Sequence, residues 1–543
     1  MVVKKLLAFF AVTLAFISEV TAQDINVIPR PASVECRVGS FDIAGASFYV
    51  DKACEAAYAV EKLASDISAG SGKRCRMVSR PVKHSVRFIT EGSLKEEEYS
   101  LYVSEKKIEV KASKRRGFLY AIQTLRQLIP LQGWTVPCVE IRDYPQFPYR
   151  GVHLDCARHF FTVEQIKEYL DILSIYKVNH FHWHLTDDHA WRLEIKRYPL
   201  LTEVGAHNCG AVLDADPKVK GEVLYDGFYT QSQAREIVSY ADSLGITVVP
   251  EIDMPSHFTA GLAAYPYLGC TQGPYEVIRV VGPRGKGLAK DALCVGREST
   301  FDFIENVLDE VLEIFPSNLI HIGGDECIKD RWYDCSYCQG RIQEERIVSD
   351  STYTSGQYLQ VYFVNRIQKY LNSKGRRIIG WDEILDGKLD SGAVVMSWRG
   401  VKTGLEASKR GFDVIMSPVQ HCYLDYRQSR DLQREPRAFA GTVTIEDVYE
   451  FNPLEGLDAD AASHIMGVQG NLWTDVIGVW SQVEYMLLPR LAALSEVQWC
   501  SPVRKDYNVF RKAMDYHASI YDARGYVYAR HLWGIVGLVE KTD

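Results

Sequence analysis

The sequence carries no run of basic residues. Its 62 Lys and Arg residues against 70 Asp and Glu residues give a formal net charge of −8. Proteins that bind the phosphate backbone of nucleic acids usually present a basic patch, because they must neutralise a dense row of negative charges. The missing basic run therefore argues against nucleic acid as a partner.

Long hydrophobic runs are also missing after the first 22 residues. At the start of the chain, Lys4 and Lys5 precede an apolar stretch from Leu6 to Ile17, and the small-residue motif Val20-Thr21-Ala22 follows. This is the pattern of a signal peptide, and the apolar stretch is too short to span a bilayer comfortably. We therefore predict a signal peptide at residues 1–22 and an exported protein with no membrane span.

The sequence contains no Asn-x-Ser/Thr acceptor for N-glycosylation. Such an absence is unusual for a eukaryotic secreted protein of this size, so a bacterial periplasm or cell exterior fits better. The 13 cysteines are an odd number and are scattered from Cys36 to Cys500, which shows no disulfide framework and leaves the connectivity open.

The 543 residues exceed one ordinary domain. Residues 23–145 alternate short strand patterns with two helical stretches, which predicts a small α+β domain. A Pro-punctuated joint, Asp143 to Pro148, ends this pattern. We expect the catalytic domain at residues 146–501 and a C-terminal helical tail at 502–543.

From Arg150 onward, apolar strand-like runs alternate with amphipathic helices, as in parallel βαβ units. Eight such runs predict an α/β fold with a (β/α)8 TIM barrel: Gly151–Arg158, Asn179–Asp188, Thr247–His257, Leu319–Glu326, Arg377–Glu383, Val394–Gly400, Asp413–Pro418 and His464–Asp475. The longer stretches Ala190–Gly227, Phe258–Glu298 and Val419–Ala462 are predicted to be loops on the face where such barrels carry out chemistry.

Most of the predicted strands end in polar or aromatic residues that a buried strand does not need. Asp325 and Glu326 form the strongest pair, directly after Gly323 and Gly324. Glycosidic hydrolysis needs a carboxylic acid for the leaving oxygen and a second group that stabilises the positive charge at the anomeric carbon. Two adjacent residues cannot easily lie on opposite faces of one sugar ring, so an acid with a carboxylate that orients a nucleophile of the substrate fits better.

Several motifs together resemble glycoside hydrolase family 20. They are Asp155-x-x-Arg158, His184-Leu-Thr-Asp-Asp188, Pro250-Glu-Ile-Asp-Met-Pro-Ser-His257, His321-x-Gly-Gly-Asp-Glu326, Gly380-Trp-Asp-Glu383 and Asn471-Leu-Trp-Thr474. The resemblance runs through the whole barrel, and the first domain resembles the α+β domain that commonly precedes it. It implies an exo-acting β-N-acetylhexosaminidase for glycans with a terminal N-acetylhexosamine, retaining through an oxazolinium intermediate.

The resemblance also implies roles for the residues. Glu326 is expected to be the general acid and base, Asp325 to orient the 2-acetamido group, and Tyr423 to donate a hydrogen bond to its oxygen. Trp381 and Trp398 are expected to enclose the acetamido group. Asp425 is expected to hold a sugar hydroxyl, and Trp473 to lie under the sugar ring.

Arg158 is expected to grip hydroxyls at the non-reducing end, with a structural ion pair to Asp155 as the alternative. Asp187 and His257 are expected to tune the pKa of Glu326. The family pattern favours Asp187 over Asp188 for this role. Asp475 departs from the pattern because the family typically has Glu there, which leaves the preference between C4 epimers open.

Other functions were weighed against this one. His180, His182 and His184 share one strand face and could indicate a metal-dependent hydrolase, whereas alternating residues of a barrel strand also fill its interior. Cys327, Cys335 and Cys338 could bind zinc but lack a clear fourth ligand, so a disulfide or buried thiols fit better. We therefore expect no metal and no cofactor.

A carbohydrate-binding protein with an inactive barrel is the remaining alternative, and both Asp325 and Glu326 are present to argue against it. The natural glycan stays open, as does the choice between a monomer and a homodimer.

Overall fold

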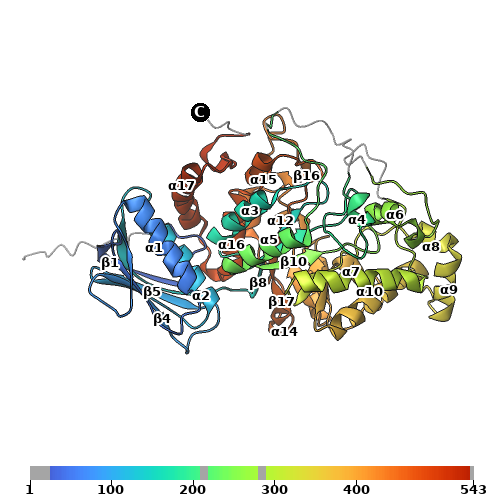
Figure 1. The fold of residues 1–543 in the computed structure, drawn as a ribbon, viewed down its shortest axis with the longest axis horizontal. Coiled ribbons are helices and arrows are strands. Elements are labelled where there is room, and N and C mark those ends of the chain that lie inside the picture. Colours follow the sequence, from blue (N-terminus) through green and yellow to red (C-terminus); the bar gives the residue numbers. More distant parts are fainter. Residues whose placement is uncertain (1–24, 208–217, 220, 279–288, 538–543) are drawn as a thin grey trace, which may run out of the picture.

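The computed structural model describes residues 25–207, 218–219, 221–278 and 289–537. The predicted signal peptide lies outside these residues. The described part of the chain forms an N-terminal sheet domain and a barrel, which lie at opposite ends of the long axis (Figure 1).

The N-terminal domain is a seven-stranded sheet in the order β1-β7-β5-β6-β4-β2-β3. Along β5 and β6 every second side chain is buried, which is the alternation that one covered sheet face requires. Helices α1 and α2 pack on the sheet, so the predicted α+β architecture is confirmed. Its elements are β1 (Ser33–Asp42), β2 (Ser47–Val50), α1 (Ala57–Ser71), β3 (Arg76–Val78), β4 (Ser85–Thr90), β5 (Tyr99–Ser104), β6 (Lys107–Ala112), α2 (Arg115–Leu128) and β7 (Thr135–Asp143).

The second domain is a closed barrel of eight parallel strands in the order β10-β11-β12-β13-β14-β17-β8-β9. All eight predicted strands are present, and the TIM-barrel prediction is confirmed. Each strand ends before its predicted last residue, because the polar residues at the predicted ends belong to the connections that follow. The strands are β8 (Tyr149–Asp155), β9 (His180–His184), β10 (Thr247–Glu251), β11 (Leu319–His321), β12 (Arg377–Trp381), β13 (Val394–Ser397), β14 (Asp413–Met416) and β17 (Ile465–Gly470).

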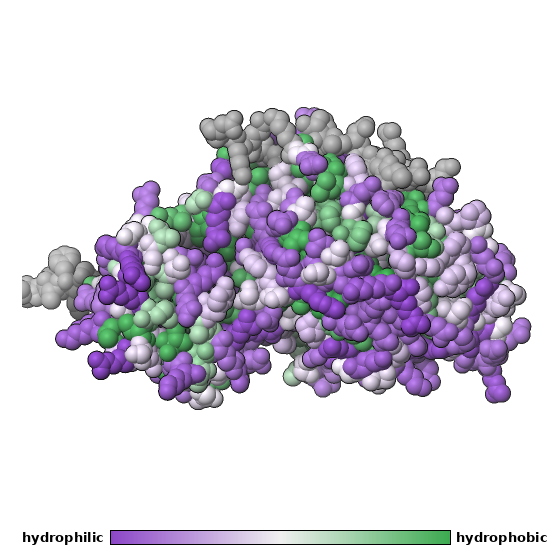
Figure 2. Space-filling model, viewed as in Figure 1, coloured by the Kyte–Doolittle hydropathy of each residue, from purple (hydrophilic) through white to green (hydrophobic). Residues whose placement is uncertain are grey.

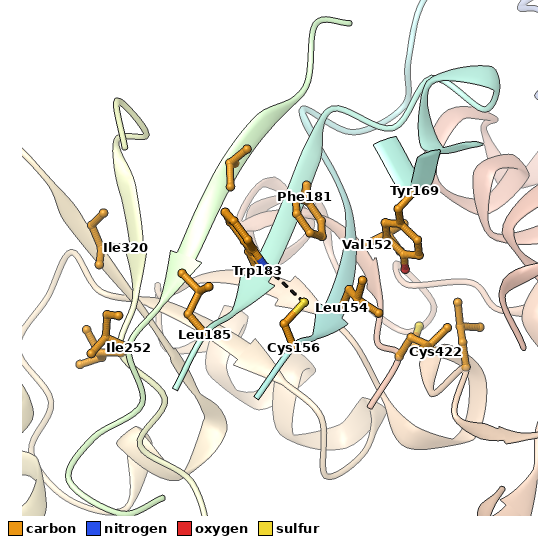
Figure 3. Packing of buried hydrophobic residues seen from close by; sticks show 14 of the residues in the cluster. Val152, Leu154, Cys156, Tyr169, Phe181, Trp183, Leu185, Ile252, Ile320 and Cys422 are labelled. Atoms are coloured by element: carbon orange, nitrogen blue, oxygen red, sulfur yellow. Dashed lines mark hydrogen bonds between the residues drawn. The ribbon is translucent and has the colours of Figure 1, made fainter. Parts of the chain in front are cut away.

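Side chains alternate between the inside and the outside of the barrel. The inward residues form a separate apolar cluster: Tyr149, Val249, Leu319, Ile379, Trp381, Val394, Met396 and Ile415. The outward residues Val152, Leu154, Phe181 and Trp183 pack toward the surrounding helices, where Tyr169 lies, and the Trp183 indole donates a hydrogen bond to Cys156 at 3.2 Å (Figure 3). The barrel is thus filled and leaves its chemistry to the strand ends.

Helices surround the barrel, and the surface over α7 and α10 is largely hydrophilic (Figure 2). Thr162, Thr230 and Thr354 begin three of the helices with capping boxes, in which the threonine and a Gln three residues later satisfy free backbone N–H groups. The barrel helices are α3 (Val163–Ile175), α5 (Gln231–Ser243), α7 (Glu298–Ile314), α10 (Ser355–Ser373), α11 (Val401–Lys409), α15 (Trp480–Leu487) and α16 (Arg490–Trp499).

The connections that follow the barrel strands contain short elements of their own. The stretches predicted to be loops therefore include helices and one small parallel strand pair. These elements are α4 (Leu200–Glu203), α6 (Thr259–Ala264), η1 (Pro266–Leu268), α8 (Asp330–Asp334), α9 (Ser336–Glu344), η2 (Asp382–Leu385), α12 (Val419–Cys422), β15 (Tyr426–Arg427), β16 (Phe439–Thr442), α13 (Ile445–Glu450) and α14 (Ala459–Ser463).

The C-terminal tail contains η3 (Pro502–Arg504), α17 (Tyr507–Arg524) and η4 (His531–Trp533), so the predicted helix is confirmed. α17 lies between the two domains (Figure 1). Tyr516 donates to the carbonyl of Ile129 at 2.7 Å, and His517 hydrogen-bonds Tyr176 at 2.9 Å. No helix in the described ranges combines the length and the apolar character that crossing a bilayer requires.

Buried charges join the two domains at the N-terminal end of the barrel. Arg150 uses its three guanidinium nitrogens to bind Glu97, Tyr120 and backbone carbonyls at 2.8–3.3 Å. Lys177 binds Asp143 at 2.8 Å and Tyr99 at 3.0 Å. Both cations are almost fully buried, and their contacts hold the sheet domain against the start of the barrel.

Candidate active site

Asp325 and Glu326 lie on the connection after β11, at the C-terminal end of the barrel. Gly323 and Gly324 turn the chain with φ of 67° and 98°, and a Cβ on Gly323 would lie 1.7 Å from Oδ1 of Asp253. Only glycine fits at Gly323, because this φ is unfavourable for other residues and the space is already filled. The glycines therefore place the two carboxylates where they are.

Glu326 itself has a φ of 51°, which non-glycine residues rarely adopt. Three contacts hold this connection in place: Ser256 Oγ donates to the Asp325 carbonyl at 2.5 Å, Gln360 donates to the Gly324 carbonyl at 2.6 Å, and Gly324 donates to Asp253 at 3.3 Å. Backbone strain of this kind gathers at functional sites, where the surrounding structure maintains it.

His257 lies between the acidic pair and two further carboxylates. Its Nε2 is 3.5 Å from Glu326 and 3.6 Å from Asp325, and its Nδ1 is 3.3 Å from Asp188 and 3.4 Å from Asp187. Burial would lower the pKa of His257, but the carboxylates of Asp187 and Asp325 raise it well above its usual range. His257 thus connects the acidic pair to both aspartates, and the distances do not separate Asp187 from Asp188.

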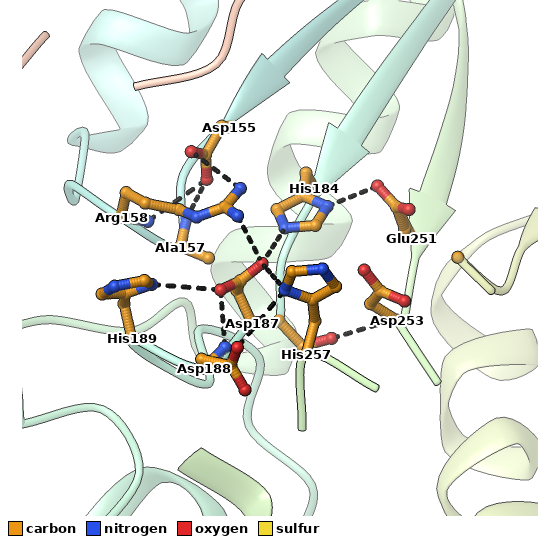
Figure 4. A network of polar contacts seen from close by, with 12 residues as sticks. Asp155, Ala157, Arg158, His184, Asp187, Asp188, His189, Glu251, Asp253 and His257 are labelled. Atoms are coloured by element: carbon orange, nitrogen blue, oxygen red, sulfur yellow. Dashed lines mark hydrogen bonds and ion pairs between the residues drawn. The ribbon is translucent and has the colours of Figure 1, made fainter. Parts of the chain in front are cut away.

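Asp187 is the centre of the network drawn in Figure 4. Its carboxylate binds Arg158 at 2.9 Å, His189 at 3.1 Å and His184 at 3.3 Å. Burial would raise the pKa of Asp187, yet Arg158 and His257 hold it well below its usual range. Asp187 is therefore a buried anion that fixes the residues around it.

Arg158 forms the ion pair that the sequence analysis gave as one of its two possible roles. Its guanidinium pairs with Asp155 at 3.3 Å and with Asp187 at 2.9 Å, and it lies 5.0 Å from the centre of the Trp473 ring. Arg158 also lines the pocket described below. The two ion pairs hold the guanidinium at the pocket wall, so the ion pair and a sugar-binding role are compatible.

A second polar network fills the inside of the barrel beneath the site, and the sequence analysis did not identify its centre, Glu251. This carboxylate accepts hydrogen bonds from the Trp381 indole at 3.0 Å and binds His321 at 2.9 Å, His182 at 3.1 Å and His184. The signal in the sequence was a charged residue within the apolar run Thr247–Glu251.

His180, His182 and His184 lie on the inner face of β9, as expected. Ring contacts join His180 to Tyr149 and His182 to His153. His153, His182 and Glu251 place ligand atoms within 4.8 Å of one another. Three imidazoles and one indole surround Glu251. Burial lowers the pKa of His184, but the Glu251 carboxylate raises it well above its usual range, so a protonated imidazole balances the charge of Glu251 without a metal ion. This network fits a support for Trp381 better than a metal site.

One pocket collects ten of the eleven predicted site residues. It has a volume of about 140 Å³ and also touches Tyr426 and Phe439, which the sequence analysis did not identify. Asp187 is the eleventh predicted residue and lies behind the pocket, bound to Arg158. The pocket residues predicted from the sequence are Arg158, His257, Asp325, Glu326, Trp381, Trp398, Tyr423, Asp425, Trp473 and Asp475.

Aromatic side chains form much of the pocket wall. Trp381 lies 5.7 Å from Trp473, and the ring of Tyr423 is stacked 6.2 Å from that of Trp398. The Trp398 indole donates to Glu383 at 2.9 Å. Flat apolar faces of this kind suit sugar rings, while the fixed indole N–H groups keep them in place.

Four buried carboxyl groups at the site have raised pKa values. Burial raises the pKa of Asp325 to about 6 and that of Glu383 to about 8, and it also raises the pKa of Asp425 and Asp475. Within the described residues, Oδ1 of Asp325, Oδ1 of Asp425 and Nε of Arg158 have no hydrogen-bond partner. Since buried polar atoms are nearly always paired, these atoms are available to a polar ligand.

A larger cavity of about 980 Å³ lies on the N-terminal domain, lined by Arg37, Lys83, Arg87, Lys107 and neighbouring residues. Glu105 is the only carboxylate in its lining, whereas acid chemistry on a glycoside requires a pair of groups with different pKa values. The smaller pocket at the barrel end is therefore the candidate active site.

Comparison with known proteins agrees with a candidate active site on the barrel. The profile of "Glycosyl hydrolase family 20, catalytic domain" matches residues 147–502, and that of "Glycosyl hydrolase family 20, domain 2" matches residues 24–144. A β-hexosaminidase of Porphyromonas gingivalis is 39% identical over 507 residues, and the match covers 90% of this chain and 62% of that protein.

Two solved structures are similar along almost the whole chain. The exo β-N-acetylglucosaminidase of Vibrio harveyi in complex with N-acetylglucosamine has a TM-score of 0.81 at 30% identity, covering 94% of this chain and 79% of that chain. The β-N-acetylhexosaminidase of Bacteroides fragilis has a TM-score of 0.78 at 31% identity, and the match covers 93% of this chain and 97% of that chain.

Proposed function

The chain belongs to glycosyl hydrolase family 20, and on that premise we propose that it is an exo-acting β-N-acetylhexosaminidase. Its substrates would be glycans with a terminal, non-reducing β-linked N-acetylglucosamine or N-acetylgalactosamine. The observation that carries this proposal is the placement of two adjacent carboxylates, Asp325 and Glu326, in one pocket with Arg158. The Vibrio harveyi structure with N-acetylglucosamine supports the class of sugar.

The adjacent carboxylates favour a nucleophile from the substrate. In glycosidases with an enzyme nucleophile or base, two carboxyl groups about 5–9.5 Å apart flank the sugar. Asp325 and Glu326 are instead neighbours on a single connection, so they do not flank the sugar in this way. Asp325 would accept a hydrogen bond from the N–H of the 2-acetamido group and orient its carbonyl oxygen toward the anomeric carbon.

The reaction then proceeds in two steps. In the first, the acetamido oxygen bonds to the anomeric carbon while Glu326 protonates the departing glycosidic oxygen, which gives an oxazolinium intermediate. In the second, Glu326 takes a proton from water, the water oxygen bonds to the anomeric carbon, and the acetamido group is restored. Two displacements retain the β configuration.

His257 and Asp187 would support the proton transfers of Glu326. His257 carries positive charge because its pKa is raised, and it lies 3.5 Å from Glu326. That charge lies beside the carboxylate of Glu326, and the anions Asp187 and Asp188 on the other side of His257 offset it. The two aspartates would thus hold His257 in place beside Glu326.

The remaining pocket residues would hold the sugar. Tyr423 would donate to the acetamido oxygen, Trp381 and Trp398 would enclose the acetamido group, and Trp473 would lie against the ring. Arg158, Asp425 and Asp475 would bind the outer hydroxyls, since Arg158 Nε and Asp425 Oδ1 are unpartnered among the described residues. Asp475 is one methylene shorter than the family's Glu, so its contact would be longer or pass through water.

We also propose that the protein is exported, from the sequence of residues 1–22, and that its source is bacterial, from the absence of an Asn-x-Ser/Thr acceptor. We propose further that the chain divides into domains at 23–145, 146–501 and 502–543. The choice between a monomer and a homodimer stays open, and light scattering of the purified protein would decide it.

The experiment for the proposed function compares 4-nitrophenyl β-N-acetylglucosaminide with the matching β-glucoside. We expect wild type to cleave only the acetamido substrate, in the presence of EDTA, and Glu326→Gln to lose this activity. Equal cleavage of both sugars would indicate an enzyme nucleophile. Sensitivity to EDTA that persists when Cys335 and Cys338 are both replaced by Ser would indicate a metal-dependent hydrolase. Binding of the sugar without cleavage would indicate an inactive carbohydrate-binding barrel.

A further inference from the structure

Four cysteines from three separate segments meet beside the barrel. Cys270 follows η1, and Cys294 ends the same connection before α7. Cys335 and Cys338 flank the start of α9, after β11. The four Sγ atoms all lie within 4.8 Å of one another, and Cys294, Cys335 and Cys338 are buried.

The sulfur spacing distinguishes a metal site from disulfides. The Sγ–Sγ distances are 3.7 Å for Cys270 and Cys338, 3.6 Å for Cys294 and Cys335, and 3.7 Å for Cys294 and Cys338. A disulfide bond measures about 2.05 Å. Thiolates held about 2.3 Å from a tetrahedral zinc ion lie about 3.8 Å apart, which is close to the observed spacing.

We propose that Cys270, Cys294, Cys335 and Cys338 bind one structural Zn²⁺ ion in a tetrahedral site, here called the four-cysteine site. Cys335-Ser-Tyr-Cys338 has the two-residue spacing that structural zinc sites use. Four protein ligands leave no open position on the ion, so it takes no part in the chemistry of the sugar. The proposal does not depend on the proposed function.

The site corrects the zinc hypothesis drawn from the sequence. That hypothesis grouped Cys327 with Cys335 and Cys338 and lacked a fourth ligand. In the structure Cys327 is not in the group, and Cys270 and Cys294 supply the other two positions. Cys294 precedes Cys335 by 41 residues and Cys270 precedes Cys338 by 68, which is why the spacing in the sequence did not show them.

The surrounding backbone is arranged to hold the four-cysteine site. Cys294 N–H donates to the Leu268 carbonyl at 2.7 Å, and Thr300 Oγ1 donates to the Cys294 carbonyl at 2.8 Å. A Cβ on Gly296 would lie 2.2 Å from the backbone of Tyr337, so the two segments touch directly there. These contacts orient the sulfurs before any ion binds.

A positive charge lies next to the site. Arg297 is three residues after Cys294, and its guanidinium lies 4.0 Å from the ring centre of Tyr337, which lies between Cys335 and Cys338 in the sequence. Four thiolates around Zn²⁺ carry a net charge of about −2, which a neighbouring cation offsets. Arg297 therefore fits the electrostatics of a zinc–thiolate site.

The ion would join the two connections that carry the catalytic groups. Leu293, next to Cys294, donates to the Pro255 carbonyl at 2.9 Å, two residues before His257. The Trp332 indole donates to the Leu293 carbonyl at 2.9 Å and ties the segment that follows Glu326 to the same point. Zinc would thus be a positioning element for His257 and Glu326.

The direct test is the metal content of the mature protein, purified without a metal-binding tag from zinc-supplemented cells. Elemental analysis is expected to give about one zinc per chain. Titration with an organomercurial should release the zinc as four thiols react, and replacement by Co²⁺ should give the visible absorption bands of tetrahedral cobalt–thiolate. A chain without zinc whose mass shows disulfides among these four cysteines would overturn the proposal.

Variants locate the ion. Cys335→Ser combined with Cys338→Ser is expected to abolish zinc binding, while Cys327→Ser and Cys75→Ser keep about one equivalent. Glu326→Gln should also keep its zinc, which separates failure of this proposal from failure of the proposed function. If the double variant does not fold, the organomercurial and cobalt measurements on wild type decide. Unchanged zinc content in a folded double variant would contradict the site.

Discussion

The two ends of the barrel both bury charge, but they differ in how completely the charges are paired. At the N-terminal end, Arg150, Lys177 and Asp143 are buried, and none of them has an unpartnered side-chain atom within the described residues. At the C-terminal end, Arg158, His257, Asp325 and Asp425 each have at least one. Only the second end opens into the pocket of the predicted site residues.

This difference shows that buried charge alone does not mark an active site. A fully paired network can fix one domain against another, as Lys177 and Asp143 do between α3 and β7. In a network beside a cavity, donors and acceptors that have no partner in the protein can bind a substrate. In TIM barrels the C-terminal end carries the chemistry and the N-terminal end contributes to stability. In this barrel the two ends differ in whether their buried polar side chains are fully hydrogen-bonded.

The largest expected effect is the loss of activity in Glu326→Gln. We expect kcat/KM for the acetamido substrate to fall by about 10²- to 10⁴-fold, since general acid and base catalysis contributes that much. The melting temperature should stay close to that of wild type, because the Glu326 side chain is 36% exposed. Steady-state kinetics and a thermal melt check both values. A wild-type rate in this variant would show that Glu326 is not the general acid.

Lys177→Met tests the fully paired N-terminal end of the barrel, where we expect a loss of stability and no loss of activity. Removing this cation leaves the Asp143 carboxylate buried without its charge partner, which should cost about 3–5 kcal/mol of unfolding free energy. The kcat of the folded fraction should not change. Lys62→Met removes an exposed ion pair with Asp66 and is the control, with an expected change under about 1 kcal/mol. Equal stability of the two variants in urea would contradict the comparison.

Asp325→Asn should lose activity and gain stability relative to wild type. The folded pKa of Asp325 is about 6 against an ordinary 3.8, so its ionisation opposes folding as pH rises from about 4 to about 6. About two pKa units correspond to about 3 kcal/mol, and this cost is fully present above pH ~6. The variant should therefore gain stability relative to wild type as pH rises through this window.

For wild type, kcat/KM should rise with pH through about 6, because the ionised form of Asp325 orients the acetamido group. Thermal melts of both proteins across this range, with a pH profile of wild type, check the pair of expectations. A stability difference that does not vary with pH would show that Asp325 is not held in its protonated form.

The smallest expected effect is that of Asp475→Glu, which restores the residue typical of the family. A direct hydrogen bond contributes about 0.5–1.5 kcal/mol, so discrimination between N-acetylglucosaminide and N-acetylgalactosaminide should increase about two- to tenfold. The measurement is the ratio of kcat/KM for the two 4-nitrophenyl glycosides. An unchanged ratio would mean that Asp475 does not contact the epimeric hydroxyl.

The sequence predicted the elements whose periodicity is strong. The eight barrel strands were identified because their apolar runs are buried on both sides. The strand ends were predicted too late: β11 ends at His321, whereas the predicted strand ran on to Glu326.

What the sequence did not show depends on contacts between distant segments. Glu251 draws together histidines from β9 and β11, and Tyr426 and Phe439 reach the pocket from a small strand pair that no periodicity indicated. The four cysteines meet only after the connections fold. The roles given to the predicted residues still come from the family resemblance, and the geometry supports them by placing the residues together.

The most direct test of substrate assistance is a series of 4-nitrophenyl glucosaminides whose N-acetyl group carries none, one, two or three fluorines. Each fluorine withdraws electrons from the carbonyl oxygen that we propose as the nucleophile. The account predicts that kcat falls steeply with each fluorine while the leaving group stays the same. A kcat that does not change along the series would contradict it and assign the nucleophile to the protein or to water.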